Sequence, residues 1–386
     1  MKVLIVTPSY FPMVGGSETL VRAMCTRLNK LGIRSDIMTL HMNKKWKPIW
    51  SEKTEQSGLF SVFKVPALNP FPFAFAGPLY YPLRINVLPR LDFRKKLEDY
   101  DIIHFLGEAD LSLAIFSVSI QKPKIMHCVG VPGLGEQFRR HPIMRKFFTR
   151  IFRNLAGLYI VFSPEEREVL ADLGITKNRT MLWAYGVDTD VFRPDESKKV
   201  DNLILFVGRI HRVKGLHVLL KSIRLLRFKV RVVIIGPILD LEYFEYIKRM
   251  SMVINKEGFH TVEYLGNLGQ TDLISWYQKA AVLVRPDLVG ASGAGLSTME
   301  ALACGTPVIG VQNHVVRDRI DGRIVRPNDP AMLAKSFREL LEKKELALRY
   351  GREGRRIIEQ DYNLKTALNR LVEIYEQMLS CWEDST

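Results

Sequence analysis

Residues 203–215 read LILFVGRIHRVKG, and this stretch decides the fold of the second half of the chain. Its first five residues, Leu203–Val207, form a short apolar run that is typical of a strand buried in a parallel sheet. A glycine and several cations follow in the next seven residues, among them Arg209 and Lys214, which lie five positions apart. Because ligands of open α/β sheets bind at the carboxyl ends of the strands, we expect both cations at a binding edge.

Similar apolar runs alternate with longer amphipathic segments along the whole chain. Strands are expected first at Val3–Thr7, Ser35–Leu40, Leu59–Val65, Ile102–Phe105, Lys124–Cys128, Leu158–Phe162 and Thr180–Trp183, and then at Leu203–Val207, Lys229–Ile235, Thr261–Tyr264, Ala281–Arg285 and Pro307–Val311. This rhythm predicts an α/β fold of parallel βαβ units. The polar stretch Asp188–Asp201 interrupts the rhythm and is the expected linker.

The length of 386 residues and the hydrophobic content of 47% suit two α/β domains with separate cores. After Asp329 the pattern is helical. The last segment, Lys365–Leu379, places a row of apolar side chains on one helical face: Leu368, Leu371, Ile374, Tyr375 and Met378. A helix of this kind needs a surface to cover.

The chain is basic, with 56 Lys and Arg against 41 Asp and Glu and a formal net charge of +15. We therefore expect an anionic partner, and nucleic acid, an anionic membrane and phosphates all satisfy that expectation. The four cysteines are scattered without C-x-x-C spacing, which argues against a zinc site or a disulfide framework and favours a reducing cytoplasm.

Two apolar segments bear on the membrane. The opening run Val3–Thr7 is too short for a signal peptide and is expected to be a buried strand. The uncharged run Val65–Leu83 contains five prolines, which would break a helix, so it is expected to be a loop and not a membrane span.

Glycines follow the first expected strand at Gly15 and Gly16, and a helix is expected to begin there. Backbone N–H groups at a helix start face an anion favourably. The alternative is a glycine turn with Ser17 as the helix cap and Glu18 in the first turn, and two glycines do not decide between them.

The cations of the stretch Gly208–Gly215 suit phosphate. Arginine clamps phosphate oxygens with two parallel hydrogen bonds, while lysine acts as a mobile point charge. A structural ion pair is the alternative, but no acid lies within this stretch, so we favour phosphate binding by Arg209 and Lys214. His211 is expected to be solvated.

A second candidate phosphate site precedes the helix expected near Glu300. Small residues such as Gly293 and Gly295 allow a diphosphate to approach free N–H groups, and the helix dipole favours its charge. Glu300 has the chemistry to accept hydrogen bonds from a ribose diol. The alternative is a capped helix with a solvated glutamate.

Four segments together resemble the motifs of the family-4 retaining glycosyltransferases of GT-B fold, in the family's order and spacing: Gly15–Glu18, Tyr185–Pro194, Gly208–Gly215 and Gly293–Ile309. The resemblance implies two facing Rossmann-like domains with a cleft between them and a C-terminal helix that returns to the first domain. Residues 1–194 with helix 366–386 would form the acceptor domain, and residues 195–365 the donor domain.

The resemblance also implies roles for individual residues. Arg209 and Lys214 would hold the diphosphate and stabilise the leaving nucleotide, Glu300 would bind the ribose, and His127 would contact the donor sugar and reacting centre. A histidine at a strand end is otherwise more often structural. The remaining donor-binding positions are Gly16, Gly208, Ser292, Gly293, Gly295, Leu296 and Ser297, and the acceptor side would include Gly15, Gly16 and Glu18.

One position departs from the family pattern. The family usually carries a glutamate eight residues before the position of Glu300, where it contacts hydroxyls of the donor sugar, and this chain has Ser292 there. Serine donates and accepts but carries no charge. Sugar recognition must therefore differ, or a neighbour such as Asp287 must substitute.

The expected partner is a nucleotide-diphosphate sugar, with no cofactor and no metal. Between Arg139 and Arg153 lie six cations and no acid, interleaved with apolar residues at helical spacing. A helix of this kind either lies on an anionic membrane or packs its apolar face on the protein core. Because the aromatic loop 66–83 and the net charge also suit a membrane surface, we favour a lipid-linked or membrane-proximal acceptor. The protein would then be cytoplasmic and would lie at the inner membrane face.

Three alternatives stay open. A soluble sugar or sugar-phosphate acceptor would leave the basic segment to bind phosphates or nothing. A catalytically impaired sugar-nucleotide scaffold is motivated by Ser292. Nucleic-acid binding has no motif beside the charge and is not expected, and a nicotinamide enzyme is disfavoured because neither half has G-x-G-x-x-G after its first strand.

Overall fold

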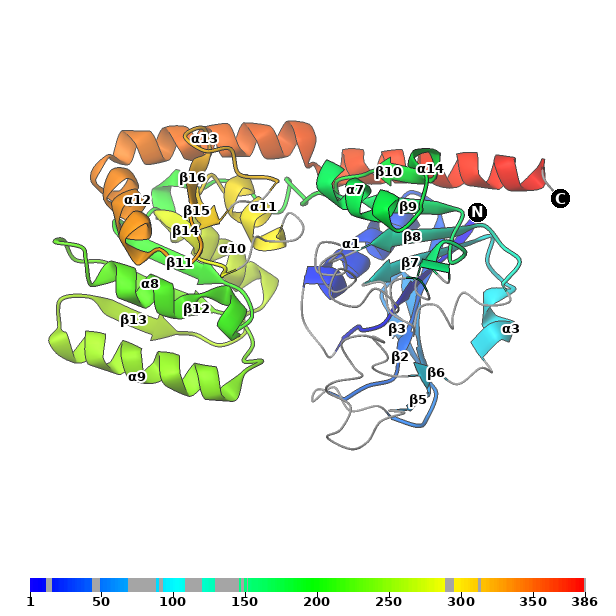
Figure 1. The fold of residues 1–386 in the computed structure, drawn as a ribbon, viewed down its shortest axis with the longest axis horizontal. Coiled ribbons are helices and arrows are strands. Elements are labelled where there is room, and N and C mark those ends of the chain that lie inside the picture. The colour runs from blue at the N-terminus through cyan, green and yellow to red at the C-terminus, as the bar shows by residue number, and fades with distance from the viewer. Residues whose placement is uncertain are drawn as a thin grey trace. The chain divides into compact units, whose positions relative to one another are not determined.

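The structure is a computed structural model that describes residues 1–11, 16–43, 49–68, 88–89, 93–107, 120–128, 146, 149–150, 152–288, 295–311 and 314–384. The chain divides into two compact units: unit 1 comprises Met1–Ala184 and Lys365–Thr386, and unit 2 comprises Tyr185–Leu364. Figure 1 shows a sheet with covering helices in each. The expected pair of parallel α/β domains is confirmed.

Unit 1 is built on an eight-stranded sheet with the order β10-β9-β8-β7-β1-β2-β4-β3. Every pairing is parallel except that of the edge strand β3, which pairs with β4 in antiparallel orientation. The strands are β1 (Lys2–Thr7), β2 (Arg34–Leu40), β3 (Lys53–Ser57), β4 (Phe60–Val65), β7 (Ile102–Gly107), β8 (Lys124–Cys128), β9 (Leu158–Val161) and β10 (Thr180–Leu182), and a separate antiparallel pair is β5 (Ala67–Leu68) with β6 (Leu88–Pro89).

The described helices of unit 1 are α1 (Gly16–Lys30), α3 (Arg94–Leu97), α7 (Pro164–Asp172), the short η2 (Lys177–Arg179) and the terminal α14 (Leu364–Glu383). One face of the sheet packs against α3 and α7 in a continuous apolar core. Because side chains alternate along a strand, His104 of β7 points to the opposite face, where it meets Tyr375 of α14.

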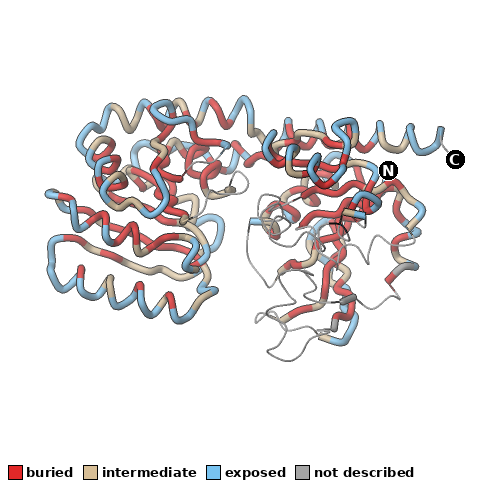
Figure 2. Tube along the Cα trace, in the orientation of Figure 1, coloured by how far each residue is buried: buried red, intermediate tan, exposed pale blue. Residues whose placement is uncertain are grey.

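The terminal helix α14 belongs to unit 1, as the resemblance implied. Leu368, Leu371 and Tyr375 are fully buried, and Ile374 is nearly so. The indole Nε1 of Trp183 donates to the carbonyl of Ala367 at 2.8 Å, which ties the helix to the end of β10. The amphipathic stripe predicted from the sequence is the contact surface of this helix, and Figure 2 shows its buried and exposed stretches alternating.

Unit 2 contains a six-stranded parallel sheet with the order β13-β12-β11-β14-β15-β16. Its strands are β11 (Leu203–Val207), β12 (Arg231–Ile235), β13 (Thr261–Tyr264), β14 (Val282–Arg285), β15 (Val308–Val311) and β16 (Gly322–Val325). The helices α8 (Leu216–Ile223), α9 (Leu241–Glu257) and α12 (Pro330–Glu342) bury their apolar stripes in one core, and α11 (Leu296–Ala303) packs with α10 (Gln270–Lys279) and α13 (Lys344–Asp361).

The strand order of unit 2 determines where its loops meet. The chain moves outward from β11 to β12 and β13, then returns to place β14 on the other side of β11. The loops that follow β11 and β14 therefore leave the same edge of the sheet in opposite directions. This is the switch point at which doubly wound sheets bind their ligands.

Residues 185–194 belong to unit 2, whereas the sequence placed the boundary after Pro194. Val187 donates to the carbonyl of Tyr362 at 2.9 Å, and Leu364 donates to the carbonyl of Val187 at 3.1 Å. The ring of Phe192 lies 6.3 Å from that of Tyr277. These contacts hold the segment on unit 2 before its first strand begins. None of the described helices is long and apolar enough to cross a membrane.

Candidate functional site

The loop after β11 is held by backbone bonds and by one glycine. Gly208 donates to the carbonyl of Ile235 at 3.0 Å. The loop then forms the short helix η4 (Arg212–Lys214), whose cap is the ring of His211 accepting from Val213 N. Gly215 ends it at φ 65°, and a Cβ there would lie 2.0 Å from the carbonyl oxygen of Pro286. The loops after β11 and β14 thus touch at a position that only glycine allows.

A chain of polar contacts runs from Lys214 to the start of α11. Nζ of Lys214 donates to Oδ1 of Asp287 at 2.6 Å. Oδ2 of Asp287 lies 3.2 Å from Nη2 of Arg285, and Nη1 of Arg285 donates to Thr298 Oγ1 at 3.1 Å. Arg285 and Asp287 are buried, and the Lys214 side chain is 22% exposed.

The series of contacts from Lys214 to Thr298 corrects one step of the sequence reasoning. No acid lies within residues 208–215, but Lys214 is paired with Asp287, which comes from the loop after β14. Asp287, considered above as a substitute for the missing sugar-binding glutamate, has both carboxylate oxygens engaged by cations. Its place in the structure is that of a counter-ion between Lys214 and Arg285.

Arg209 differs from Lys214 in its surroundings. Its side chain is exposed, and it forms no hydrogen bond or ion pair with any residue in the described ranges. Its charge nevertheless contributes to lowering the pKa of Lys214, because the two positive charges repel each other. The guanidinium is free to bind an anion with two parallel hydrogen bonds.

The start of α11 completes the cationic side of the site. Gly295 precedes the helix with φ 66°, and a Cβ there would lie 1.7 Å from Nη1 of Arg285. Among the described residues no side chain caps the helix, so the amides of Leu296 and Ser297 in its first turn are available to an anion. Ser292 and Gly293 lie outside the described residues.

Glu300 lies one turn further along α11 and is only 8% exposed. Burial raises its pKa to about 7, and a hydrogen bond from Tyr277 opposes that rise. The hydroxyl of Tyr277 donates to Oε2 at 2.7 Å, while Oε1 has no hydrogen-bond partner in the described part of the chain. The alternative of a solvated glutamate is wrong, because the helix turns this side chain into the protein.

On unit 1, the predicted acceptor-side residues lie at the start of α1. Gly16 is the first residue of the helix, and Gly15 lies outside the described residues. Glu18 is buried, and its Oε1 accepts a 2.5 Å hydrogen bond from Ser9 Oγ, just after β1. Glu18 therefore holds the loop that follows the first strand.

His127, predicted at the reacting centre, is 1% exposed inside unit 1. Its ring stacks on His104 at 5.8 Å and meets the edge of Trp183 at 5.2 Å. Burial lowers the pKa of His127 to about 4, so the ring is neutral at pH 7. In this arrangement its ring packs between those of His104 and Trp183, and the contact with the donor sugar that the resemblance implied stays a prediction.

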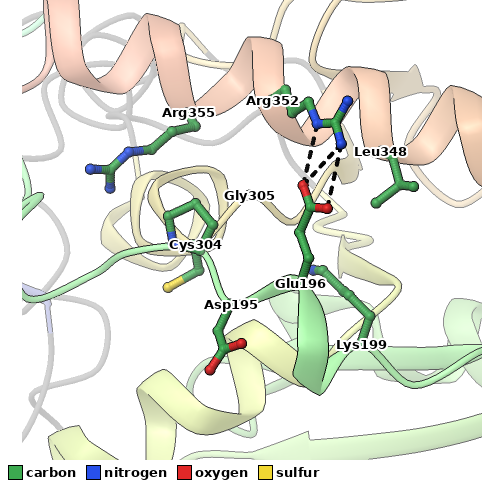
Figure 3. Close-up of a pocket in the computed structure, with 9 residues that line it drawn as sticks. Asp195, Glu196, Lys199, Cys304, Gly305, Leu348, Arg352 and Arg355 are labelled. Atoms are coloured by element: carbon green, nitrogen blue, oxygen red, sulfur yellow. Dashed lines mark hydrogen bonds and ion pairs between the residues drawn. The ribbon is translucent and has the colours of Figure 1, made fainter.

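A cavity of about 130 Å³ in unit 2 lies at the other end of α11 (Figure 3). Its lining is Pro194, Asp195, Glu196, Lys199, Cys304, Gly305, Leu348, Arg352 and Arg355. Lys199 donates to Ala280 O and Thr306 Oγ1, Arg355 donates to Phe192 O and Ala303 O, and Arg352 pairs with Glu196. These cations fasten residues 192–199, including η3 (Glu196–Lys198), to the helices beneath.

Two contributors escaped the sequence reasoning. Arg285 was noted only as the last residue of a strand. A cation at the end of a buried strand must find a partner, and this could have indicated a charged contact at the sheet edge. Tyr277 lies in the last turn of α10, and no local sequence pattern indicates its hydrogen bond to Glu300. Within the described residues, no three His, Cys, Asp or Glu side chains are grouped as a metal site.

Solved structures share this fold along nearly the whole chain. Sucrose-phosphate synthase from Thermosynechococcus elongatus matches with a TM-score of 0.75 at 20% identity, over 99% of this chain and 100% of that chain. HepE from Anabaena, solved in complex with UDP-glucose, matches with a TM-score of 0.75 at 14% identity, over 98% and 100%.

Curated relatives agree in class. O-antigen chain mannosyltransferase C of Escherichia coli is 22% identical over 98% of this chain and 99% of its own length. D-inositol 3-phosphate glycosyltransferase of Paenarthrobacter aurescens is 27% identical over 85% of each chain. Fold and relatives together define a glycosyltransferase of GT-B type.

The family follows from two profiles that together span most of the sequence. The profile described as Glycosyltransferase Family 4 matches residues 14–191, and that described as Glycosyl transferases group 1 matches residues 188–357. The chain belongs to glycosyltransferase family 4. The resemblance read from the four motifs is confirmed.

Proposed function

We propose that this enzyme transfers a hexose from a nucleotide-diphosphate sugar to a hydroxyl group, with retention of configuration, on an acceptor that is lipid-linked or part of a glycan at the membrane surface. The name of the Escherichia coli relative, an O-antigen chain mannosyltransferase, supports hexose transfer to a glycan. The complex of the Anabaena protein with UDP-glucose supports a nucleotide-sugar donor.

The observation that carries the proposal is the surplus of positive charge at the switch point of unit 2. Lys214 and Arg285 share one buried acid, Asp287, beside the start of α11, and the exposed Arg209 adds a third positive charge that acts on Lys214. This surplus of two positive charges matches a donor diphosphate, which carries about two negative charges between its phosphates. Preorganised cations and amides of this kind stabilise a leaving phosphate as its charge develops.

Glu300 suits the ribose. Its free Oε1 lies on the helix that begins at the phosphate site, while Oε2 is held by Tyr277. Because Tyr277 already holds one oxygen of the carboxylate, the other oxygen can accept hydrogen bonds from the ribose diol without a further loss of side-chain freedom. We assign Glu300 to the ribose hydroxyls and Tyr277 to holding it.

The reaction requires the bond between the anomeric carbon and the donor phosphate oxygen to break while the acceptor oxygen bonds that carbon on the same face. The acceptor proton passes to the leaving phosphate oxygen. In this scheme the protein supplies positioning and positive charge, which Arg209 and Lys214 provide without a metal or cofactor. A role of His127 at the reacting centre, which the family resemblance implies, stays a prediction that its variants must test.

The acceptor side rests on charge and composition. The net charge of +15 favours an anionic surface, and we propose peripheral binding to the inner membrane face of the cell. The basic segment 139–153 and the aromatic loop 66–83 remain the candidate contacts, and both lie largely outside the described residues. At the described end of the basic segment, Phe152 is buried in the core of unit 1, as the alternative of a helix packed on the core predicts. A soluble sugar-phosphate acceptor is the second candidate, and the name of the inositol-phosphate relative favours it.

Calorimetry with UDP-, GDP- and ADP-sugars tests the donor site. We expect one donor to bind at micromolar concentration and Arg209→Ala to abolish that binding. Release of free nucleotide on addition of an acceptor, with the anomer of the product read by NMR, tests transfer and retention. Binding without any nucleotide release would support an impaired scaffold, and an inverted product would overturn retention.

A further inference from the structure

We propose that Asp287 and Arg285 are positioning residues that hold the ammonium of Lys214 in place for the donor diphosphate. This inference rests on the proposed function, because the diphosphate is what the ammonium would bind. It concerns contacts that neither motif contains, since Asp287 and Arg285 lie between the Gly208–Gly215 stretch and α11.

The geometry is that of a buried relay. Thr298 on α11 accepts from Nη1 of Arg285, Arg285 pairs with Oδ2 of Asp287, and Asp287 accepts from Nζ of Lys214. Through this series of contacts the flexible side chain of Lys214 is connected to α11, the helix whose first amides would face the phosphate. A lysine side chain has many accessible rotamers, and such anchoring restricts them before the donor arrives.

Gly295 is part of the same arrangement. Its missing Cβ leaves the space that Nη1 of Arg285 occupies, since a Cβ would lie 1.7 Å from that atom. Arg285 is therefore seated directly against the backbone at the start of α11. Its guanidinium adds positive charge where the helix amides already favour an anion.

The electrostatics of Lys214 make the proposal testable. Burial lowers the pKa of Lys214; Asp287 raises it, and the charges of Arg285 and Arg209 lower it further. These three residues have the largest charge effects on the ammonium. Removing the acid and removing the arginine must therefore shift the titration of Lys214 in opposite directions.

Competitive acetylation measures this titration without a donor. The protein is treated with trace acetic anhydride between pH 6 and 11, and acetylation of Lys214 is read by peptide mass spectrometry. We expect Asp287→Asn to lower the midpoint by about one pH unit or more, the usual effect of an adjacent opposite charge. Arg285→Gln should raise the midpoint, because Asp287 then faces Lys214 alone.

A matched control is Glu245→Gln, which removes an acid from an exposed pair with Lys248 on α9. It should leave the Lys214 midpoint unchanged. Equal midpoints in wild type, Asp287→Asn and Arg285→Gln, or shifts in the same direction, would overturn the proposal. If Asp287→Asn fails to fold, the upward shift in Arg285→Gln decides alone.

The second readout is the affinity for UDP and GDP over the same pH range. We expect the alkaline loss of affinity to move down in Asp287→Asn and up in Arg285→Gln, and to disappear when Lys214→Arg removes the titrating group. Acetylation shifts without nucleotide binding would sink the proposed donor site and leave only an ion pair. Nucleotide binding with unshifted acetylation would sink the positioning role.

Discussion

The hydroxyl of Tyr277 lies 2.7 Å from Oε2 of Glu300, and both side chains are buried. Tyr277 is fixed in turn, because Thr306 Oγ1 donates to its carbonyl at 2.6 Å. The carboxyl that we assign to the ribose is thus held by one neutral donor and no cation. Burial of that carboxyl raises its pKa to about 7, within the range in which the enzyme would work.

Nucleotide affinity should therefore depend on pH. Below about pH 7 Glu300 is protonated and is a weaker acceptor for ribose hydroxyls, so affinity for UDP or GDP should fall as the pH drops. Tyr277→Phe removes a bond that lowers the pKa and should move the midpoint to higher pH. Calorimetry between pH 6 and 8.5 measures both. A 2′,3′-dideoxynucleotide, which lacks the diol, should show neither effect.

The same carboxyl should reduce stability at neutral and alkaline pH. Its pKa is raised from 4.5 in the unfolded chain to about 7 in the folded protein. As the pH rises from 4.5 to 7, the unfolded chain ionises first and the free energy of unfolding falls, by up to about 3 kcal/mol above pH 7. Glu300→Gln should recover that stability in urea unfolding at pH 8.5 but not at pH 4.5. No gain at the higher pH would contradict the burial argument.

Arg209→Ala should lower turnover about a hundredfold or more, because loss of one preorganised stabiliser of developing charge costs about 3 kcal/mol in the barrier. The matched control is Arg212→Ala, three residues further on, whose guanidinium lies over the Tyr243 ring. Steady-state nucleotide release measures both. Equal activity in the two variants would remove Arg209 from the site.

Gly295→Ala should disrupt the donor site, because the new Cβ would lie 1.7 Å from Nη1 of Arg285 at a backbone with φ 66°. Gly258→Ala is the control, since its φ is 76° and nothing lies within 4 Å of the new Cβ. The control should lose only the cost of a left-handed alanine, roughly 1 to 2 kcal/mol. The melting temperature and the nucleotide affinity should both fall further in Gly295→Ala than in Gly258→Ala. Equal losses in the two variants would exclude the clash with Arg285.

The buried histidines should make unit 1 sensitive to acid. Burial lowers the pKa of His127 to about 4 and that of His104 as well, against 6.5 in the unfolded chain. As the pH falls from 6.5 towards 4, the unfolded chain takes up protons that the folded core refuses, so stability falls. His127→Asn should lose about 1 to 3 kcal/mol at pH 8 and show a shallower fall. Unchanged stability with abolished turnover would support the catalytic role that the family resemblance implies for His127.

The buried parallel strands could be predicted because their apolar runs are continuous. The run Leu203–Val207 coincides with β11, and Lys124–Cys128 with β8. Two edge strands escaped prediction for a physical reason. The sequence KTEQS of β3 has no apolar pattern because it is largely exposed, and β16 begins at a glycine and is only four residues long.

The site was partly readable for a similar reason. Arg209, Lys214 and Glu300 follow local rules for strand ends and helix starts, and the switch point brings the two segments together. The pairing of Lys214 with Asp287 joins residues 73 positions apart. No local pattern encodes such a contact, and the burial of a single histidine such as His127 depends on distant residues such as Trp183 that pack against it.

The hydrogen bond between His104 and Tyr375 joins residues 271 positions apart. Unit 1 thus includes both the first strand of the chain and its last helix, while unit 2 is continuous from Tyr185 to Leu364. During synthesis, unit 2 has its full sequence before unit 1 does. The first half therefore lacks the cover of α14 until that helix has been synthesised, and a chain that stops before α14 would expose the part of unit 1 that Leu368, Leu371 and Tyr375 bury to chaperones and proteases.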